Sequence, residues 1–80
     1  MSETDIEPAK TVDARGSACP GPLMDLIGAV RSAESGAVVR LLSDNERSLT
    51  DVPEWVDETD NDLLATEEGD DHHAFYVEKA

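Results

Sequence analysis

The chain has 80 residues, of which 19 are acidic and only 6 are lysine or arginine, so its formal net charge is −13. A chain of this length forms one small domain with a modest core, which excludes an active site built with a separate substrate-binding domain. The negative charge repels phosphate backbones and anionic membrane surfaces, and aromatic residues make up only 4% of the chain, too few to stack nucleic-acid bases. The composition therefore predicts no direct binding to nucleic acid or to membranes.

The acidity itself fits two kinds of protein. High net charge with few aromatic residues is typical of disordered chains. It is also typical of folded proteins adapted to high salt, in which counterions screen the repulsion between surface carboxylates. Here the acidic residues are scattered between apolar segments and do not form one long run. This distribution favours a folded, halophilic acidic protein.

The first residues predict a short leader and no export signal. Residues 1–9 are acidic and lack the apolar core of a secretory signal, so we expect a disordered leader followed by one domain over residues 10–80. No run approaches the ~18 apolar residues that a membrane-spanning helix needs. A cytoplasmic location is the prediction that follows.

The first half of the domain predicts a strand, a tight loop and a helix. The β-branched content of residues 10–13 favours a short strand, and two glycines and two prolines within residues 16–22 specify the loop that follows. An amphipathic helix is expected from about residue 20 to residue 33, with Gly36 ending it. Apolar side chains recur through it at helical spacing, at Leu23, Leu26, Ile27 and Val30.

The most strand-like run of the chain is residues 37–42. One of its faces carries alanine, valine and leucine, whereas the other carries Val38, Arg40 and Leu42. Because side chains alternate between the two faces of a strand, we expect a central strand whose second face is less completely buried.

The second half predicts a helix and a closing hairpin. Ser48 or Thr50 is expected to cap the helix, because serine and threonine accept hydrogen bonds from the free N–H groups of a first turn. Residues 60–61, Asp-Asn, are expected to end it, since both types tolerate left-handed backbone. Residues 63–67 and 73–78 then predict two strands joined by a tight turn.

The predicted order is β-α-β-α-β-β. The opening β-α-β unit implies a parallel pair of strands, and the closing hairpin adds antiparallel strands. The fold class expected is therefore α+β: a two-layer sandwich with a mixed four-stranded sheet and two helices on one face.

Cys19 is the candidate site residue. It is the only cysteine of the chain, so it forms no internal disulfide and no multi-cysteine metal site. It stands where the loop meets the predicted helix, and the free N–H groups of a helix N-terminus stabilise an anion. A thiolate is favoured there, and the thiolate is the nucleophilic form of cysteine. The alternative is a small apolar residue buried under the first turn.

Other candidate chemistry is weaker. The run Asp70-Asp71-His72-His73 contains metal-ligating residue types. Adjacent histidines at the start of a strand point to opposite faces, which opposes their binding one ion, so we expect a solvated turn. Neither histidine is close to Cys19 in sequence, and no catalytic dyad is apparent. We therefore predict no metal and no cofactor.

These residues resemble the signature of a known family, the TusA/SirA-like sulfur carriers. The run Asp13-Ala-Arg-Gly16 followed by Cys19-Pro20-Gly21-Pro22 is similar to that family's motif Asp-x-x-Gly-x-x-Cys-Pro-x-Pro. The resemblance covers nearly the whole domain and includes Ser43-Asp44 and the predicted element order.

The resemblance implies that Cys19 accepts sulfane sulfur as a persulfide, with Pro20 and Pro22 shaping its helix. Asp13, Arg15 and Gly16 are the expected supporting residues, Arg15 as a nearby cation that can offset the surrounding carboxylates. The resemblance also implies a donor protein, either a desulfurase or a rhodanese-like protein, and an acceptor protein. Routes served by such carriers include tRNA thiolation, molybdenum-cofactor assembly and sulfur oxidation.

The sequence departs from the family pattern at three places. Ser17 replaces an apolar residue, Asp60 replaces a glycine, and Ile27 and Gly28 stand where tRNA-thiolation members often carry basic residues. The partners of those members are therefore not transferred to this chain.

A sulfurtransferase-type carrier needs no acid–base machinery of its own. The alternatives are a non-catalytic protein-interaction or regulatory module with the same fold, and a peroxide-sensing thiol.

Overall fold

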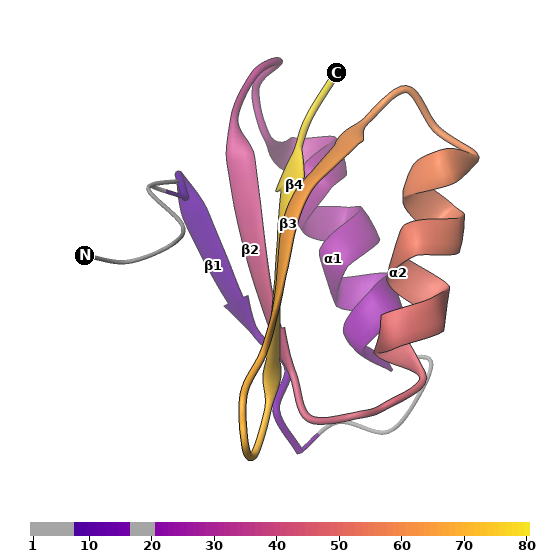
Figure 1. Ribbon diagram of the computed structural model, residues 1–80. Coiled ribbons are helices and arrows are strands. Elements are labelled where there is room, and N and C mark those ends of the chain that lie inside the picture. Colours follow the sequence, from indigo (N-terminus) through magenta and orange to yellow (C-terminus); the bar gives the residue numbers. More distant parts are fainter. Residues whose placement is uncertain (1–7, 17–20) are drawn as a thin grey trace.

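The computed structural model describes residues 8–16 and 21–80, and these form two layers (Figure 1). The predicted order β-α-β-α-β-β is confirmed. The strands are β1 (Lys10–Asp13), β2 (Val38–Ser43), β3 (Asp62–Glu68) and β4 (His73–Glu78), and the helices are α1 (Gly21–Ser32) and α2 (Ser48–Asp57).

The four strands make one mixed sheet with the order β1-β2-β4-β3. β1 runs parallel to β2, as a β-α-β unit requires, while β4 pairs antiparallel with both β2 and β3. A bulge between Leu63 and Ala65 shifts the register of the closing hairpin. The mixed sheet expected from the sequence is therefore confirmed.

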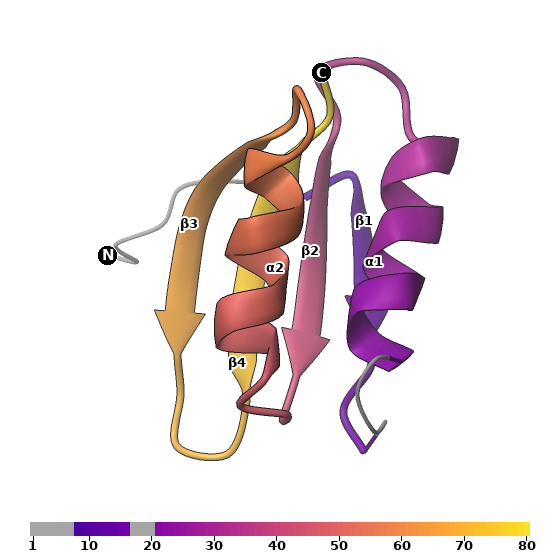
Figure 2. The same ribbon diagram turned by 90° about the vertical axis from the view of Figure 1, so that its right-hand side faces the viewer.

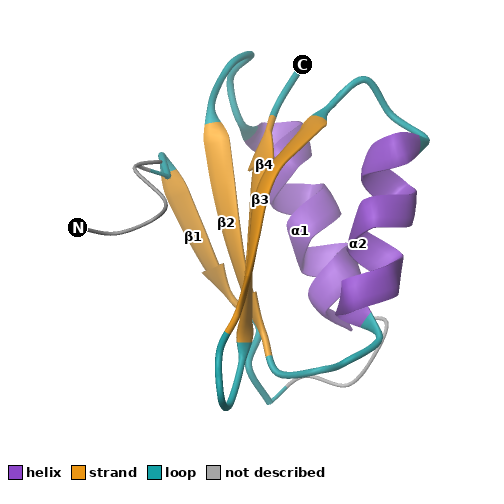
Figure 3. Cartoon of the chain, in the orientation of Figure 1, coloured by secondary structure: helices purple, strands orange, loops and turns teal. Residues whose placement is uncertain are grey.

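Both helices lie on the same face of the sheet (Figures 1 and 3). The core lies between the two layers. Its buried side chains come mainly from α1, α2, β2 and β4, whereas β1 and β3 contribute partly buried residues. The central strands supply its middle, since Val39, Leu41, Phe75 and Val77 are all fully buried. The fully or nearly buried core residues on the helices are Leu26, Ala29, Val30, Val52 and Val56.

The second face of β2 is only partly covered, as its alternating pattern predicts. Val38, Arg40 and Leu42 are intermediate in exposure, whereas Val39 and Leu41 between them are buried. On this face Arg40 lies opposite Tyr76 of β4. The fold is thus a two-layer sandwich in which no helix covers this face in the part of the chain that the structure describes (Figure 3).

The residues predicted to cap and to end α2 do not have these roles in the structure. The N-cap residue is Arg47, without a side-chain cap, and Ser48 is already in the helix with its hydroxyl bonded to Ser43 Oγ at 2.8 Å. Thr50 is likewise inside the helix. Residues 60–61 are not left-handed, because the described residues with positive φ are both glycines. The C-cap residue is Glu58 instead, and the hydroxyl of Thr59, which follows it, donates to Val56 O at 2.9 Å and accepts from Asn61 N at 3.2 Å.

Several chain segments lie together at one end of the molecule (Figures 1 and 2). The carboxyl ends of β1 and β2, the first turns of α1 and α2, and the β3–β4 turn all lie there. Parallel strands end on the same edge of a sheet, so the connections that follow β1 and β2 become neighbours although they are far apart in sequence. This end is where the predicted site residues fall.

Candidate functional site

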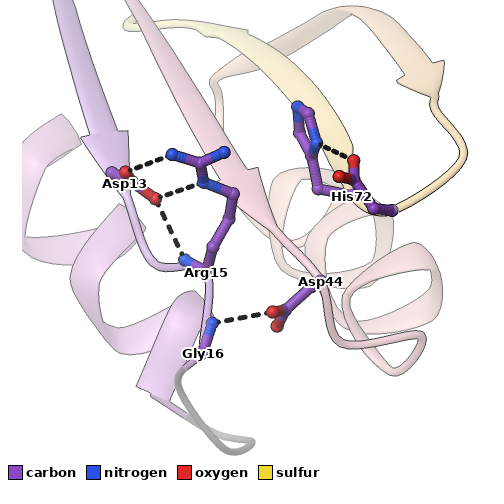
Figure 4. Close-up of polar contacts among 6 residues, drawn as sticks. Asp13, Arg15, Gly16, Asp44 and His72 are labelled. Atoms are coloured by element: carbon purple, nitrogen blue, oxygen red, sulfur yellow. Dashed lines mark hydrogen bonds and ion pairs between the residues drawn. The ribbon is translucent and has the colours of Figure 1, made fainter.

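The connection from β1 to α1 carries the predicted site residues, and Figure 4 shows how those that are described lie. Asp13 ends β1, and Arg15 and Gly16 follow it. Asp44, which directly follows β2, and His72 of the β3–β4 turn lie beside them (Figure 4). Three separate connections therefore meet at this edge.

Arg15 is ion-paired with Asp13. Its Nε lies 2.9 Å from Asp13 Oδ1 and its Nη2 lies 2.9 Å from Oδ2, and its backbone N–H donates to Oδ1 at 3.2 Å. Both side chains are about half exposed, at 49% and 52%, so water screens the pair and it adds little to stability. The two-point geometry still holds the guanidinium in one place.

This pairing changes the acidity of both groups. The hydrogen bonds from Arg15 lower the pKa of the Asp13 carboxyl to about 2, and the positive charge of Arg15 adds to the effect. Asp13 in turn raises the pKa of the guanidinium, and Asp71 and Asp44 raise it further. Three carboxylates therefore act on Arg15, and Asp13 is the one paired with it.

Gly16 stands three residues before Cys19 and has an unusual backbone conformation. Its φ is +86°, a region that side-chain-bearing residues rarely adopt. A Cβ added there would meet no atom within 4 Å, so the requirement for glycine is conformational and not steric. The N–H of Gly16 donates to Asp44 Oδ2 at 2.8 Å.

The β3–β4 turn brings a second polar pair to the same edge. His72 Nδ1 lies 2.7 Å from Asp71 Oδ1, and His72 lowers the pKa of the Asp71 carboxyl. His73 lies at the start of β4 opposite Ser43 of β2, and its Nδ1 is buried without a hydrogen-bond partner among the described residues. No cluster of three metal-ligating side chains occurs in residues 8–16 and 21–80.

Cys19 and Pro20 lie outside the described residues, and so does Ser17. Pro22 is the second residue of α1, so the helix begins two residues after Cys19 in sequence. The first turn of α1 contains no acidic residue, and its last turn contains Arg31. In a chain with 19 acidic residues, the positive end of this helix therefore carries no carboxylate of its own.

Asp44 was not among the supporting residues predicted for the site. The sequence did indicate its general location, because Asp44 directly follows a strand that was expected to run parallel to the strand ending at Asp13. The hydrogen bond between Asp44 and Gly16 could not be predicted, since the two residues are 28 positions apart in the sequence.

The acidity of Asp13 provides a direct check of the ion pair. The carboxyl is expected to titrate with a midpoint near pH 2, and Arg15→Ala is expected to return it towards the ordinary value of about 3.9. Because the folded pKa is lowered, the small stabilisation is present above about pH 4 and is lost as the pH falls towards 2. Carboxyl carbon chemical shifts measured by NMR against pH would report it, and an unchanged midpoint in Arg15→Ala would contradict the pairing.

No helix in the described part of the chain is long and apolar enough to cross a membrane. This finding agrees with the absence of a long apolar run in the sequence.

Comparisons with known proteins show which family the chain resembles. Residues 10–79 match the model of the family described as "Sulfurtransferase TusA". A protein of Archaeoglobus fulgidus is 44% identical over 68 residues, covering 85% of this chain and 93% of that protein. A protein of Halobacterium salinarum is 30% identical over 76 residues, covering 94% of each. Both carry the name "Putative sulfur carrier protein".

A solved structure agrees with the sequence comparisons. The crystal structure of a SirA-like protein from Desulfitobacterium hafniense superimposes with a TM-score of 0.70 at 25% identity, covering 86% of this chain and 95% of that one. The α+β fold and the resemblance noted in the sequence are therefore confirmed. The chain belongs to the TusA family of sulfur carriers.

Proposed function

We propose that Cys19 is the carrier residue, which accepts sulfane sulfur as a persulfide and passes it to an acceptor protein. The observation that carries this proposal is the start of α1 two residues after Cys19, with no acidic side chain in its first turn. The free N–H groups of a helix N-terminus amount to about half a positive charge and favour a thiolate close to them. Thiols in that setting have pKa values lowered from about 8.5 to roughly 3.5–7.5.

The proposed transfer needs no acid–base residue. The Cys19 thiolate attacks the terminal sulfur of a donor persulfide, R–S–SH, and a new S–S bond forms as the donor S–S bond breaks. The donor leaves as R–S⁻, and Cys19 becomes Cys–S–SH. In the second step an acceptor thiolate attacks the same terminal sulfur and restores the Cys19 thiolate. No net oxidation occurs in either step, because each replaces one S–S bond by another.

The supporting residues act on the loop around Cys19. Pro20 and Pro22 suit the entry to a helix, because their fixed φ is close to the helical value. Gly16 supplies a backbone conformation that other residues rarely adopt, and the Asp13–Arg15 pair holds the start of the loop. Arg15 also places a positive charge within four residues of Cys19 and so opposes the effect of the surrounding carboxylates on its thiol.

The partners in this proposal are proteins. A desulfurase or a rhodanese-like protein is the expected donor, and an enzyme that consumes sulfur is the expected acceptor, with tRNA thiolation, molybdenum-cofactor assembly and sulfur oxidation as candidate routes. All of these would take place in the cytoplasm. The formal net charge of −13 favours partners with basic docking surfaces, since complementary potentials speed encounter.

Intact-mass spectrometry tests the proposal. After incubation with a cysteine desulfurase and cysteine, or with a rhodanese and thiosulfate, the protein is expected to gain the mass of one sulfur atom, and a thiol reductant should remove it. Cys19→Ser is expected to gain nothing, and the result is unambiguous because the chain has one cysteine.

Two other outcomes would contradict the proposal. No gain with either donor would favour a protein-interaction module. Addition of oxygen on exposure to peroxide, without any sulfur gain, would favour a peroxide-sensing thiol.

A further inference from the structure

We propose that the hollow between α1 and α2 is a docking site for a partner protein, and that it takes an apolar side chain flanked by lysine or arginine. The proposal rests on the proposed function, because a sulfur carrier must dock on the proteins that donate and accept its sulfur. All residues that line the hollow belong to the described part of the chain.

The hollow lies where the two helices meet. α1 and α2 are neighbours on one face of the sheet (Figure 2). One residue of α1 and four residues on or just after α2 line the hollow: Leu23, Asp51, Glu54, Trp55 and Glu58. Its volume is about 220 Å³. Pockets that enclose a drug-sized ligand have about 300–1,000 Å³, so this hollow suits a side chain of another protein.

The spacing along α2 places its lining side chains on one stripe. Residues 51, 54, 55 and 58 stand at i, i+3, i+4 and i+7, which fall on the same side of a helix. Val52 and Val56, each one position further along, are buried in the core. The stripe therefore borders the core side of the helix, with Trp55 packed partly against the core and Glu54 exposed beside it.

Trp55 and Leu23 make the hollow partly apolar. Both side chains are partly buried against the core and still line the hollow. Tryptophan is enriched among the few residues that dominate the binding energy of protein interfaces. The face of its ring also attracts the cation of a lysine or an arginine. The hollow thus offers contacts to an apolar side chain and to the basic residues beside it.

The rim of the hollow carries only negative charge. Its charged residues are Asp51, Glu54 and Glu58, and residues 48–78 contain no lysine or arginine. Glu54 and Glu58 form no ion pair with any residue that the structure describes. Since potentials across an interface are complementary, the segment that docks here must bring basic side chains.

The carboxylates of the rim do not stabilise α2. Glu58 is the C-cap residue of the helix, whose last turn contains no basic residue. The C-terminal end of a helix carries partial negative charge and repels a carboxylate. Removing the charges of Glu54 and Glu58 is therefore expected to weaken docking without lowering the melting temperature. A loss of binding then cannot come from damage to the fold.

Fluorescence anisotropy with synthetic peptides tests the proposal. The probe is the fluorescein-labelled peptide KRLLKRLLKR, which combines leucine with basic residues. KRSSKRSSKR keeps the charge and lacks the leucines, whereas EDLLEDLLED keeps the leucines and reverses the charge. The protein carries Cys19→Ser, so that no sulfur transfer takes place. In 1 M KCl the Debye length is about 3 Å, which removes long-range attraction to the net charge of −13.

Two charge-matched double variants locate the binding. Glu54→Gln with Glu58→Gln removes two carboxylates at the hollow, and Glu68→Gln with Asp70→Asn removes two exposed carboxylates of the β3–β4 hairpin. We expect the first to bind KRLLKRLLKR about fivefold more weakly, because two contact ion pairs are lost, and the second to bind within about twofold of the Cys19→Ser protein. Both control peptides should bind at least about tenfold more weakly.

Trp55 reports whether the peptide occupies the hollow. It is the only tryptophan of the chain, so bound KRLLKRLLKR is expected to protect its fluorescence from quenching by acrylamide. Binding without protection would overturn the proposal, and so would no binding of KRLLKRLLKR at all. Equal losses in the two double variants would overturn it as well, because the net charge and not the hollow would then be responsible. Equal binding of KRSSKRSSKR would overturn the apolar contact.

The outcomes are separate from those of the proposed function. The binding measurements use a protein without the cysteine, so they decide the role of the hollow whether or not the wild type gains sulfur. If the wild type gains no sulfur, the proposed function fails and the docking result still stands. If it gains sulfur and the peptide does not bind, only the docking site fails.

Discussion

Replacing Phe75 by alanine is expected to lower the free energy of unfolding by about 3–5 kcal/mol. Phe75 is fully buried at the middle of β4, where it pairs with Leu41 of β2 and faces the helices. It is the only phenylalanine of the chain, and removing the ring leaves a cavity between two layers that have little other material to fill it. A small domain has only about 5–15 kcal/mol of net stability, so this single change can remove most of it.

Urea unfolding followed by tryptophan fluorescence would measure the loss. Trp55 is the only tryptophan and packs against the core while partly exposed, so its emission reports the contact between α2 and the sheet. Leu64→Ala is the matched control, because Leu64 is 42% exposed on β3 and its loss should stay within about 0.5 kcal/mol. A Phe75→Ala midpoint equal to that of Leu64→Ala would mean that the core is not packed as described.

The second large effect expected is a rise in the melting temperature with salt. At 10 mM KCl the Debye length is about 30 Å, which is comparable with the dimensions of the molecule, 32 × 29 × 19 Å. Nearly every pair of its 19 acidic side chains therefore repels in dilute salt. At 1 M KCl the Debye length is about 3 Å, and only charges in contact still interact. The folded state, which brings the charges closest together, gains most from this screening.

Calorimetry across that range of KCl would show the effect, and a charge-reduced variant would show its origin. Glu54, Asp57 and Glu58 are exposed on and just after α2, whose sequence contains no basic residue. Replacing them by Gln, Asn and Gln is expected to raise the melting temperature at 10 mM KCl and to flatten its dependence on salt. Equal melting temperatures from 10 mM to 1 M KCl would contradict the high-salt interpretation of the composition.

The elements of the fold were predictable where local pattern and core packing agree. The apolar spacing of α1 and the alternation in β2 each match one face that meets the core, so periodicity alone located them within a residue or two. β4 was placed at its observed bounds, His73–Glu78, because a β-rich run and a turn coincide there. These agreements depend on short-range features of the chain.

The ends of α2 were not predictable, because tertiary contacts competed for the same side chains. Ser48 has the residue type of an N-cap, but its hydroxyl is bonded to Ser43 in the buried connection from β2. Asp and Asn at 60–61 have the types that tolerate left-handed backbone, but the helix already has its C-cap at Glu58, and the hydroxyl of Thr59 bonds back to Val56 O. Residue type indicates what a side chain can do, and its neighbours decide which of the possible bonds it makes.

The sequence by itself determined the fold class and the signature that contains Cys19, because both reside in spacing: apolar periodicity for the elements, and a few residues at set offsets for the motif. Only the tertiary structure decided that Arg15 is ion-paired with Asp13, and that Gly16 is bonded to Asp44, 28 positions away. For the Gly16–Asp44 bond the reason is the parallel pairing of β1 with β2. It brings the carboxyl ends of both strands to one edge, and contacts between the connections that follow depend on register and backbone direction, which no local pattern encodes.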